Sequence, residues 1–313
     1  MTPNSSDDRK VTGVGDPAAP PFRRLVGQVV AVGDLDAAVA DFQRCGFTLS
    51  DRSARPEWEI DTATFGFRDG CYLELVTSTG RSHEIGRTVG SFLDRRGEGL
   101  YMTTIEVPDV ADVFDALGGL DGGIVAAEPA AAPPDRGIPC DLLWIRPSRF
   151  AGAFVQLLSY RDGPFVEDAV TPGMRGLFNQ AIAVSDIERA VADVERLGQR
   201  VSDRSSRADW GLDTATFHLG PESSIEFVAP RDRGRPTGGA VGAFLDRTGG
   251  GHYMTVFEVD DVEDLYRSYQ ASGVRTLGPP TRTPPESPWP PADQFWIHPA
   301  VTHGAFIEFL TLV

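Results

Sequence analysis

Two glutamates lie in short segments that alternate like β-strands. In "CYLELV" Glu74 shares a face with Tyr72 and Val76, and in "SSIEFV" Glu226 takes the equivalent place. A carboxylate among apolar strand side chains is costly unless it is paired or neutral, so its pKa can rise into the range useful to a general base. The alternative is a structural carboxylate that accepts bonds from a neighbouring Arg or Tyr, or that points to solvent.

A polar phrase built around a tryptophan occurs twice. "SDRSARPEWEIDTATF" begins at Ser50 and "SDRSSRADWGLDTATF" begins at Ser202, and 11 of their 16 positions are identical. Trp58 and Trp210 are either core anchors between a helix and a sheet or stacking walls at the mouth of a binding site. In the second case, the arginines of the phrase would bind an anionic or carbonyl-bearing ligand.

The repeat extends far beyond this phrase, because adding 152 to a residue number of the first half reaches its counterpart in the second. "QVVAVGDLDAAVAD" corresponds in this way to "QAIAVSDIERAVAD", and "SFLDRRGEGLYMTTIEV" to "AFLDRTGGGHYMTVFEV". A period of 152 residues is too long for a solenoid, whose units span about 20 to 50 residues. The pattern predicts a disordered tail over residues 1–22, a domain over 23–160, a linker over 161–175 and a second domain over 176–313.

Composition excludes several kinds of partner. The chain of 313 residues has a formal net charge of −16, which repels nucleic acids and anionic membrane surfaces. No run of 18 uncharged apolar residues is present, so no transmembrane helix is expected. The three cysteines lie far apart, which indicates neither a disulfide framework nor a cysteine zinc site. We expect a cytoplasmic protein without nucleic-acid or membrane partners.

Each half shows the same order of hydrophobic patterns. "LVGQVVAV" predicts a strand, "DLDAAVADFQRCG" predicts a helix with an Asp cap and a glycine end, and "TATFGF" and "CYLELVT" predict strands. The Trp58 segment is expected between the helix and the sheet. "YMTTIEV" then starts the order again, followed by a helix over "DVADVFDALGG" and strands over "DLLWIRP" and "AFVQLLS". Each half is therefore expected to contain two βαβββ-like modules, which gives four modules and an α+β fold.

Two stretches carry a family resemblance. "YLELVTSTGRSHEIGRTVGSFLDRRGEGLYMTTIEV" and "WIHPAVTHGAFIEF" resemble the vicinal oxygen chelate superfamily, in particular methylmalonyl-CoA epimerase and its glyoxalase-like relatives. Those proteins carry "ELL.P…FL..RGEG.HH.AFEV" and a closing "HP…HG…EL". The resemblance implies that paired modules curl their mixed sheets into cups that hold a small molecule. An epimerase subunit has two modules and works as a dimer, so this chain resembles such a dimer fused end to end. We expect the chain to be either a monomer or a homodimer.

The resemblance also implies four metal-ligand positions in each half, and this sequence departs from most of them. The family's first His falls on Gly27 and Asn179, or on Gln28 and Gln180 if a bulge shifts the strand by one residue. The next position is kept as an acid in both halves, the second His is replaced in both, and the final acid is kept only in the second half. These three positions are, in the order of the chain, Glu74, Met102 and Gln156 in the first half and Glu226, Met254 and Glu308 in the second.

A thioether is a weak donor to the hard or borderline metals of this superfamily. We therefore expect no metal and no other cofactor in either half, although a divalent ion held by Glu226, His252 and Glu308 stays open. On strand alternation His252 shares a face with Met254, which would place it in the second cup.

On the family pattern Glu226 and Glu308 face one cavity, where two carboxyl groups could serve as acid and base. Without a metal, an enolate would need another oxyanion donor, for which Gln180, Asn179 and Tyr253 are candidates. The sequence thus predicts Glu226, Glu308, Tyr253 and Gln180 as catalytic residues. The predicted substrate-binding residues are Gln28, Trp58, Glu74, Tyr101, Met102, Gln156, Asn179, Trp210, His252 and Met254.

Two functions remain open at this point. One is an enzyme of the epimerase, isomerase or lyase kind that moves a proton next to a carbonyl or thioester, with one or both cups active. The other is a non-catalytic protein that holds an aromatic or polyketide-like small molecule, as the bleomycin-resistance branch of the superfamily does. In both, the partner is a small molecule.

Overall fold

Two eight-stranded sheets form the frame of the computed structural model, which describes residues 22–116, 130–131, 140–161, 169–283 and 290–313. The predicted tail, apart from the buried Phe22, and part of the predicted linker lie outside the described residues. The strands of the first sheet, in spatial order, are β2 (Leu49–Arg55), β3 (Ile60–Gly66), β4 (Tyr72–Ser78), β1 (Arg24–Ala31), β5 (Gly99–Glu106), β8 (Phe154–Tyr160), β7 (Cys140–Ile145) and β6 (Ala130–Ala131).

The second sheet repeats this order with the strands of the second half. Its strands are β10 (Asp203–Arg207), β11 (Leu212–Leu219), β12 (Ser223–Pro230), β9 (Met174–Ala183), β13 (Gly251–Val259), β16 (Ile307–Leu312), β15 (Ala292–Ile297) and β14 (Thr281–Arg282). In both sheets the first and fourth strands of each module pair in parallel, and the two modules join through an antiparallel pair. The predicted α+β fold with four βαβββ modules in two curved mixed sheets is confirmed.

Six helices connect and cover the described strands: α1 (Leu35–Arg44), α2 (Glu84–Arg96), α3 (Val110–Ala116), α4 (Ile187–Glu195), α5 (Pro236–Thr248) and α6 (Val262–Ser272). Asp34 caps α1 as expected, since its side chain accepts the Ala37 N–H, and Gly46 follows the helix at a φ of 84°. None of the described helices is long and apolar enough to cross a membrane.

The polar segment around Trp58 was expected between helix and sheet, but part of it is itself a strand of the sheet. Its first residues form β2, whose Ser53 pairs with Thr62 of β3, and the tryptophan occupies the turn that follows. The same arrangement recurs in β10 and β11. The sequence analysis missed both edge strands because their polar residues show no apolar alternation.

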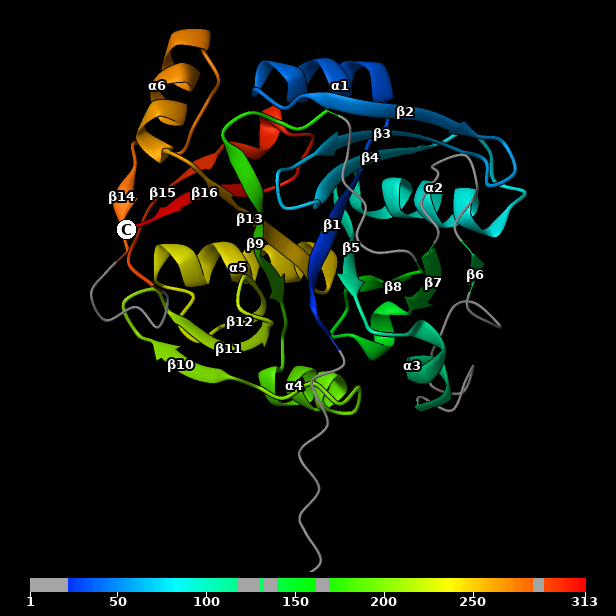
Figure 1. Ribbon diagram of the computed structural model, residues 1–313. Coiled ribbons are helices and arrows are strands. Elements are labelled where there is room, and N and C mark those ends of the chain that lie inside the picture. The colour runs from blue at the N-terminus through cyan, green and yellow to red at the C-terminus, as the bar shows by residue number, and fades with distance from the viewer. Residues whose placement is uncertain (1–21, 117–129, 132–139, 162–168, 284–289) are drawn as a thin grey trace, which may run out of the picture.

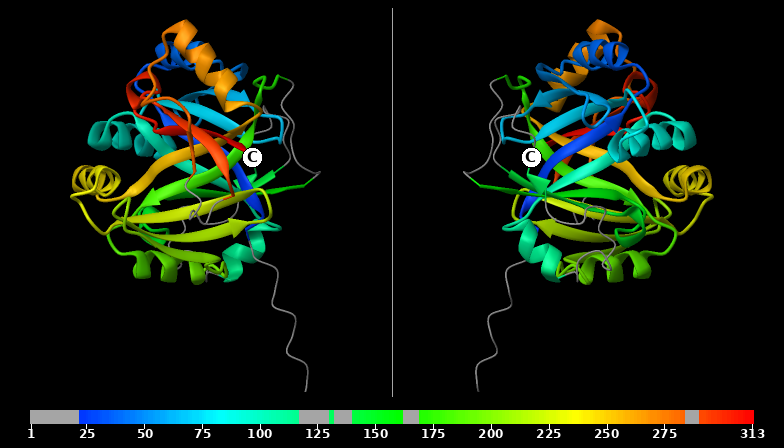
Figure 2. Two further views of the ribbon diagram at one scale, coloured as in Figure 1. Left: turned by 90° about the vertical axis from the view of Figure 1, so that its left-hand side faces the viewer. Right: turned by 90° about the vertical axis from the view of Figure 1, so that its right-hand side faces the viewer.

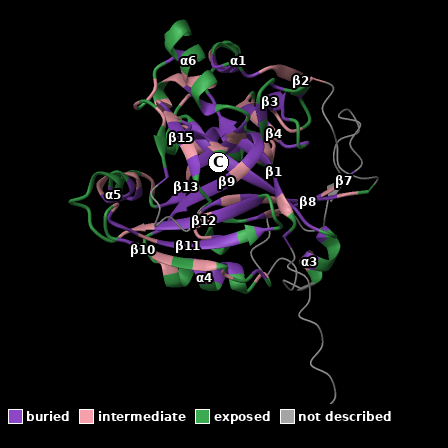
Figure 3. Cartoon of the chain, turned by 60° about the vertical axis from the view of Figure 1, so that its left-hand side comes forward, coloured by how far each residue is buried: buried purple, intermediate pink, exposed green. Residues whose placement is uncertain are grey.

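The two halves pack around one shared apolar core. At one end of the molecule α1 lies beside α6, and at the opposite end α3 lies beside α4 (Figures 1 and 2). Phe47, just after α1, packs its ring 6.1 Å from Phe257 and 6.3 Å from Phe309 of the second half. Figure 3 shows that the buried residues gather in the sheets, while the outer surfaces of the helices are exposed. Each half therefore buries its outer sheet face partly against the other half.

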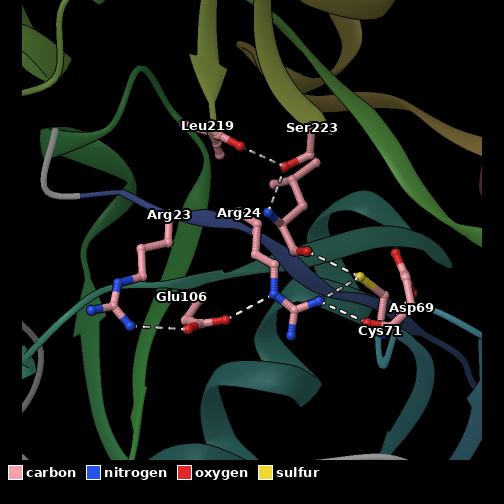
Figure 4. A network of polar contacts seen from close by, with 8 residues as sticks. Arg23, Arg24, Asp69, Cys71, Glu106, Leu219 and Ser223 are labelled. Carbon is pink, nitrogen blue, oxygen red and sulfur yellow. Dashed lines mark hydrogen bonds and ion pairs between the residues drawn. The ribbon is translucent and has the colours of Figure 1, made fainter. Parts of the chain in front are cut away.

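Hydrogen bonds also cross between the halves. The Leu25 N–H donates to the Ser223 hydroxyl at 3.0 Å, and this hydroxyl donates to the Leu219 carbonyl at 3.2 Å (Figure 4). Next to this contact Arg24 forms a partly buried ion pair with Glu106 at 2.8 Å. The Leu25–Ser223 bond fixes β1 of the first sheet against the second half, and the Arg24–Glu106 pair joins β1 to β5 within the first half.

Candidate active site

Each sheet curls around a cavity on its concave face. The first cup encloses about 280 Å³ and the second about 640 Å³. Helix α2 covers part of the first cup with Ile85 and Val89, and α5 covers the second with Ala240 and Val241. Most of the same elements line both cups, and Thr281 and Arg282 of β14 add to the wall of the second.

Glu226 and Glu308 line the second cup together. Glu226 lies on β12 and Glu308 on β16, separated in the sheet by β9 and β13. Glu308 is only 7% exposed, and one of its carboxyl oxygens accepts the indole N–H of Trp296 at 3.0 Å. The expected pair of acids in one cavity is therefore present.

The environment of Glu308 favours its neutral form. Burial raises the pKa of Glu308 to about 8, the Trp296 hydrogen bond opposes this shift, and the negative charge of Glu226 adds to it. At neutral pH the carboxyl group of Glu308 therefore holds a proton. Because its neighbour Glu226 is a second acid in the same cavity, the pair can both give and accept a proton.

The first strand of each half now has a defined register. Asn179 lines the second cup, and the Ser224 hydroxyl donates to its amide oxygen at 3.1 Å. Gln28 and Gln180 are buried away from the cavity walls and donate to backbone carbonyls, that of Met102 in the first half and that of Met254 in the second, both at 3.0 Å. The structure thus gives Gln180 no place at the cavity wall for its predicted catalytic role, and Gln28 none for its predicted contact with substrate.

A β-bulge explains why His252 is not in the second cup. The pairing of β13 with β9 shifts between His252 and Met254, so that Tyr253 is the extra residue. Tyr253 and Met254 both line the cavity, whereas His252 turns to the opposite side and reaches the first half. The assumption of strict alternation was wrong here, and His252 is not available as a metal ligand or substrate contact in the cup.

His252 instead belongs to the contact between the halves. One ring nitrogen lies 2.8 Å from the Phe154 carbonyl oxygen, and the other lies 3.2 Å from the Thr103 hydroxyl. Burial lowers the pKa of His252 to about 4. The imidazole is therefore neutral at physiological pH and has a structural role.

Tyr253 and its counterpart in the first half, Tyr101, pack in the same way in the two cups. The Tyr253 ring meets Phe244 and Phe306 edge to face, at 5.2 and 5.6 Å. The Tyr101 ring meets Phe92 and Phe154 at 5.1 and 5.4 Å. Burial raises the pKa of Tyr253. Only the second cup has the pair of acids, yet the tyrosine packs in the same way in both cups. This supports a role for Tyr253 in the cavity wall more than its predicted catalytic role.

The first cup has a different polar floor. Glu74 and Gln156 line it, but the Gln156 amide oxygen accepts the Thr104 hydroxyl at 3.1 Å, and Thr104 accepts the Tyr72 hydroxyl at 3.1 Å. Tyr72 lies directly over Gly27, where a Cβ atom would stand 2.3 Å from the tyrosine ring. The ring thus occupies the place where the second half carries Asn179.

The other predicted wall residues line the cavities. Trp58 and Met102 line the first cup, and Trp210 and Met254 line the second. The Arg207 guanidinium lies 4.2 Å from the centre of the Trp210 ring, and Arg55 lies 5.5 Å from that of Trp58. The sequence analysis missed Trp144, Trp296, Tyr160 and Phe306 as wall residues. Trp144 and Trp296 are 152 residues apart, so the sequence shows that they are equivalent. It does not show on which face of the sheet their side chains lie.

The donor set of the second cup does not fit the metal of the superfamily. The four positions carry an amide, two carboxyl groups and a thioether, with no imidazole among them. Among the residues that the structure describes, no three or more His, Cys, Asp and Glu side chains form a metal-binding group.

Comparisons with known families agree with this architecture. Residues 28–164 match the glyoxalase-like domain, and residues 180–287 match the glyoxalase/bleomycin resistance protein/dioxygenase superfamily. The chain belongs to this superfamily, also called vicinal oxygen chelate, with two of its domains in tandem. The resemblance seen in the sequence is confirmed. A search of curated proteins gave no match.

Solved structures share the fold over most of the chain. A mutant of 4-hydroxymandelate synthase from Streptomyces coelicolor aligns with a TM-score of 0.71 at 15% identity, covering 94% of this chain and 93% of the other. A fusion of a xylose isomerase-like TIM barrel with a 4-hydroxyphenylpyruvate dioxygenase aligns with 0.63 at 14% identity, covering 94% and 49%. Methylmalonyl-CoA epimerase from Mycobacterium tuberculosis aligns with 0.40 at 24% identity, covering 46% and 93%.

Proposed function

We propose that the second cup catalyses proton transfer at a carbon next to a carbonyl or thioester group, with Glu226 and Glu308 as the acid-base pair. The observation that carries this proposal is the buried carboxyl group of Glu308, whose pKa is raised to about 8 in a cavity that it shares with Glu226. A catalytic pKa near the working pH is the most effective for general acid-base catalysis. Burying this acid is costly for folding, which favours a use in chemistry.

We assign the roles from the protonated state of Glu308, which leaves Glu226 as the base. The Glu226 carboxylate removes the proton from the carbon, and the electron pair of the C–H bond moves into the enolate. Glu308 then donates its proton to the opposite face of the same carbon, which gives the epimer. Glu226 is left protonated and Glu308 ionised, and exchange with water restores both. The family membership supports an enzyme of this fold, and the particular reaction is our proposal.

The enolate oxygen needs a hydrogen-bond donor in this mechanism. Asn179 is placed for this role, because Ser224 engages its amide oxygen and the amide nitrogen remains as the donor end at the cavity wall. The donor chemistry of the cup supports a reaction without a bound metal or other cofactor. Since Gln156 replaces the second acid in the first cup, we assign catalysis to the second cup alone.

The test is isotope exchange. Purified protein is incubated in D2O with a panel of acyl thioesters and ketones, and deuterium uptake is followed by mass spectrometry. We expect Glu308→Gln and Glu226→Gln to reduce exchange by a factor of about 10² to 10⁴. Glu263→Gln, on the exposed surface of α6, is the control with unchanged exchange. Exchange that persists in both cup variants would disprove the mechanism.

The second candidate is a binding protein without chemistry, and the mainly apolar walls of both cavities favour it. It predicts that a small molecule copurifies, quenches tryptophan fluorescence on addition, and is recovered unchanged. In either case we propose that the chain acts as a monomer, because its two halves already pack as a pair. Sedimentation equilibrium at several concentrations tests the oligomeric state.

A further inference from the structure

The first cup has become a different kind of site from the second. Six aromatic rings surround a cavity of about 280 Å³, less than half the volume of the second cup. They belong to Trp58, Tyr72, Tyr101, Trp144, Phe154 and Tyr160. Such a wall offers large flat apolar surfaces to a ligand in a space near the lower limit of ligand pockets, which begin at roughly 300 Å³.

The polar groups of the first cup are tied up in a hydrogen-bonded chain. The Tyr72 hydroxyl donates to Thr104, and Thr104 donates to the amide oxygen of Gln156. The place of the second acid is thus taken by a neutral side chain whose carbonyl end is engaged. The amide nitrogen of Gln156 is the end that can donate to a ligand. This floor can position a molecule, but it has no pair of acids to move a proton.

The position of Tyr72 depends on Gly27. Any side chain at residue 27 would overlap the tyrosine ring, because a Cβ atom would stand 2.3 Å from it. The second half has Asn179 and Ser224 at these places and keeps a larger cavity. The ring therefore narrows the first cup and adds a flat surface to it.

The first cup does not offer a single kind of charge to a ligand. Arg55 is 3% exposed and lies against Trp58, while Glu74 and the exposed Glu84 of α2 also line the cavity. An anion would meet two acids, and a cation would meet the buried guanidinium. The arrangement therefore favours an uncharged ligand.

We infer that the first cup is a second, non-catalytic binding site for a neutral planar aromatic molecule of one or two rings that carries a hydrogen-bond acceptor. The rings of the wall would contact its faces and edges, and the Gln156 amide would meet its acceptor. This site does not depend on proton transfer in the second cup, so either proposal can stand without the other.

The experiment compares 2-naphthol with its saturated analogue, decahydro-2-naphthol, by isothermal titration calorimetry of the full chain. We expect 2-naphthol to bind one site at least tenfold more tightly than the saturated analogue. Trp144→Leu should weaken this binding at least tenfold, whereas Trp296→Leu, the equivalent change in the second cup, should leave it within twofold. Chromatography after incubation should recover 2-naphthol unchanged.

A second variant guards against a loss of folding. Val76→Phe adds bulk to the first cup without removing a ring, and it should also abolish binding while circular dichroism stays native. Three results would each overturn the inference: equal binding of the saturated analogue, sensitivity to Trp296→Leu instead of Trp144→Leu, or no binding of 2-naphthol at millimolar concentration.

Discussion

Trp296 donates its indole N–H to the carboxyl group of Glu308 at 3.0 Å, on the wall of the second cup. This bond counteracts part of the rise in the pKa of Glu308 that burial causes. The tryptophan therefore sets the pH range in which Glu308 holds its proton. It acts on the reaction through Glu308, as a positioning residue.

Trp296→Phe should move the alkaline limb of the pH–rate profile to higher pH. The variant keeps an aromatic ring but loses the N–H donor that stabilises the ionised form of Glu308, so the pKa of Glu308 rises further. The measurement is the pH dependence of deuterium exchange. Trp144→Phe, the matched change in the first cup, should leave the profile in place. A limb that moves to lower pH would contradict the role given to the bond.

Glu308 should make the protein less stable as the pH rises. Its pKa is about 8 in the folded protein and near 4.5 when unperturbed, so the folded state holds the proton more tightly than the unfolded chain. Its contribution is fully present below about pH 4.5 and is lost as the pH rises through about 8. The slope is at most about 1.4 kcal/mol per pH unit. Urea unfolding between about pH 6.5 and 8, above the range in which His252 titrates, should show a flatter pH dependence for Glu308→Gln. An unchanged dependence would mean that Glu308 ionises normally.

His252 should have the opposite effect. Its pKa is about 4 in the folded protein against an ordinary value of 6.5, so stability is lost as the pH falls from 6.5 towards 4. His252→Leu places the residue type of the equivalent Leu100 at this position and should remove the loss. Between about pH 4.5 and 6.5, His252 and Glu308 change the free energy of unfolding with pH in opposite directions, so their effects partly cancel in the native protein. Each single variant should show the pH dependence that the other residue causes. A loss that persists in His252→Leu would place its origin elsewhere.

Gly27→Ala should destabilise the protein by about 1–3 kcal/mol, because the added methyl group collides with the Tyr72 ring. In the background of Tyr72→Ser, which copies Ser224, the same change should cost clearly less. A double-mutant cycle of unfolding free energies measures the coupling between the two positions. Equal costs in both backgrounds would show that the ring can move aside.

Prolonged dialysis against a chelator should leave deuterium exchange within twofold of its starting rate. The donor set at the four ligand positions contains no imidazole and includes a thioether, so a bound ion is not expected to carry the reaction. Elemental analysis of protein purified without chelator is the companion measurement. Loss of exchange on chelation and its return on adding a divalent metal would contradict the metal-free mechanism.

Much of the architecture follows from the repeat in the sequence. The offset of 152 residues pairs Glu74 with Glu226 and Trp144 with Trp296, and each pair lies at equivalent places in the two sheets. The strand alternation that placed Glu226 on the concave face is also seen in the structure. These predictions succeed because the period of two is a local property of the backbone.

The errors arise where the backbone departs from that period. The bulges at Tyr101 and Tyr253 insert one residue each, and the alternation on which the placement of His252 depended ends there. No local pattern of residues announces such a bulge. The overlap of Tyr72 with Gly27 was equally hidden, because it joins two strands that are neighbours only in the folded sheet.

Having both copies in one chain has a consequence for how the protein can change. In a dimer of identical subunits, every mutation changes both sites at once, and selection acts on the combined effect. In the first cup Gly27 faces Tyr72, whereas in the second cup Asn179 faces Ser224 at the equivalent positions. The two sites have therefore diverged independently. Divergence of this kind lets one copy lose a reaction without cost to its twin.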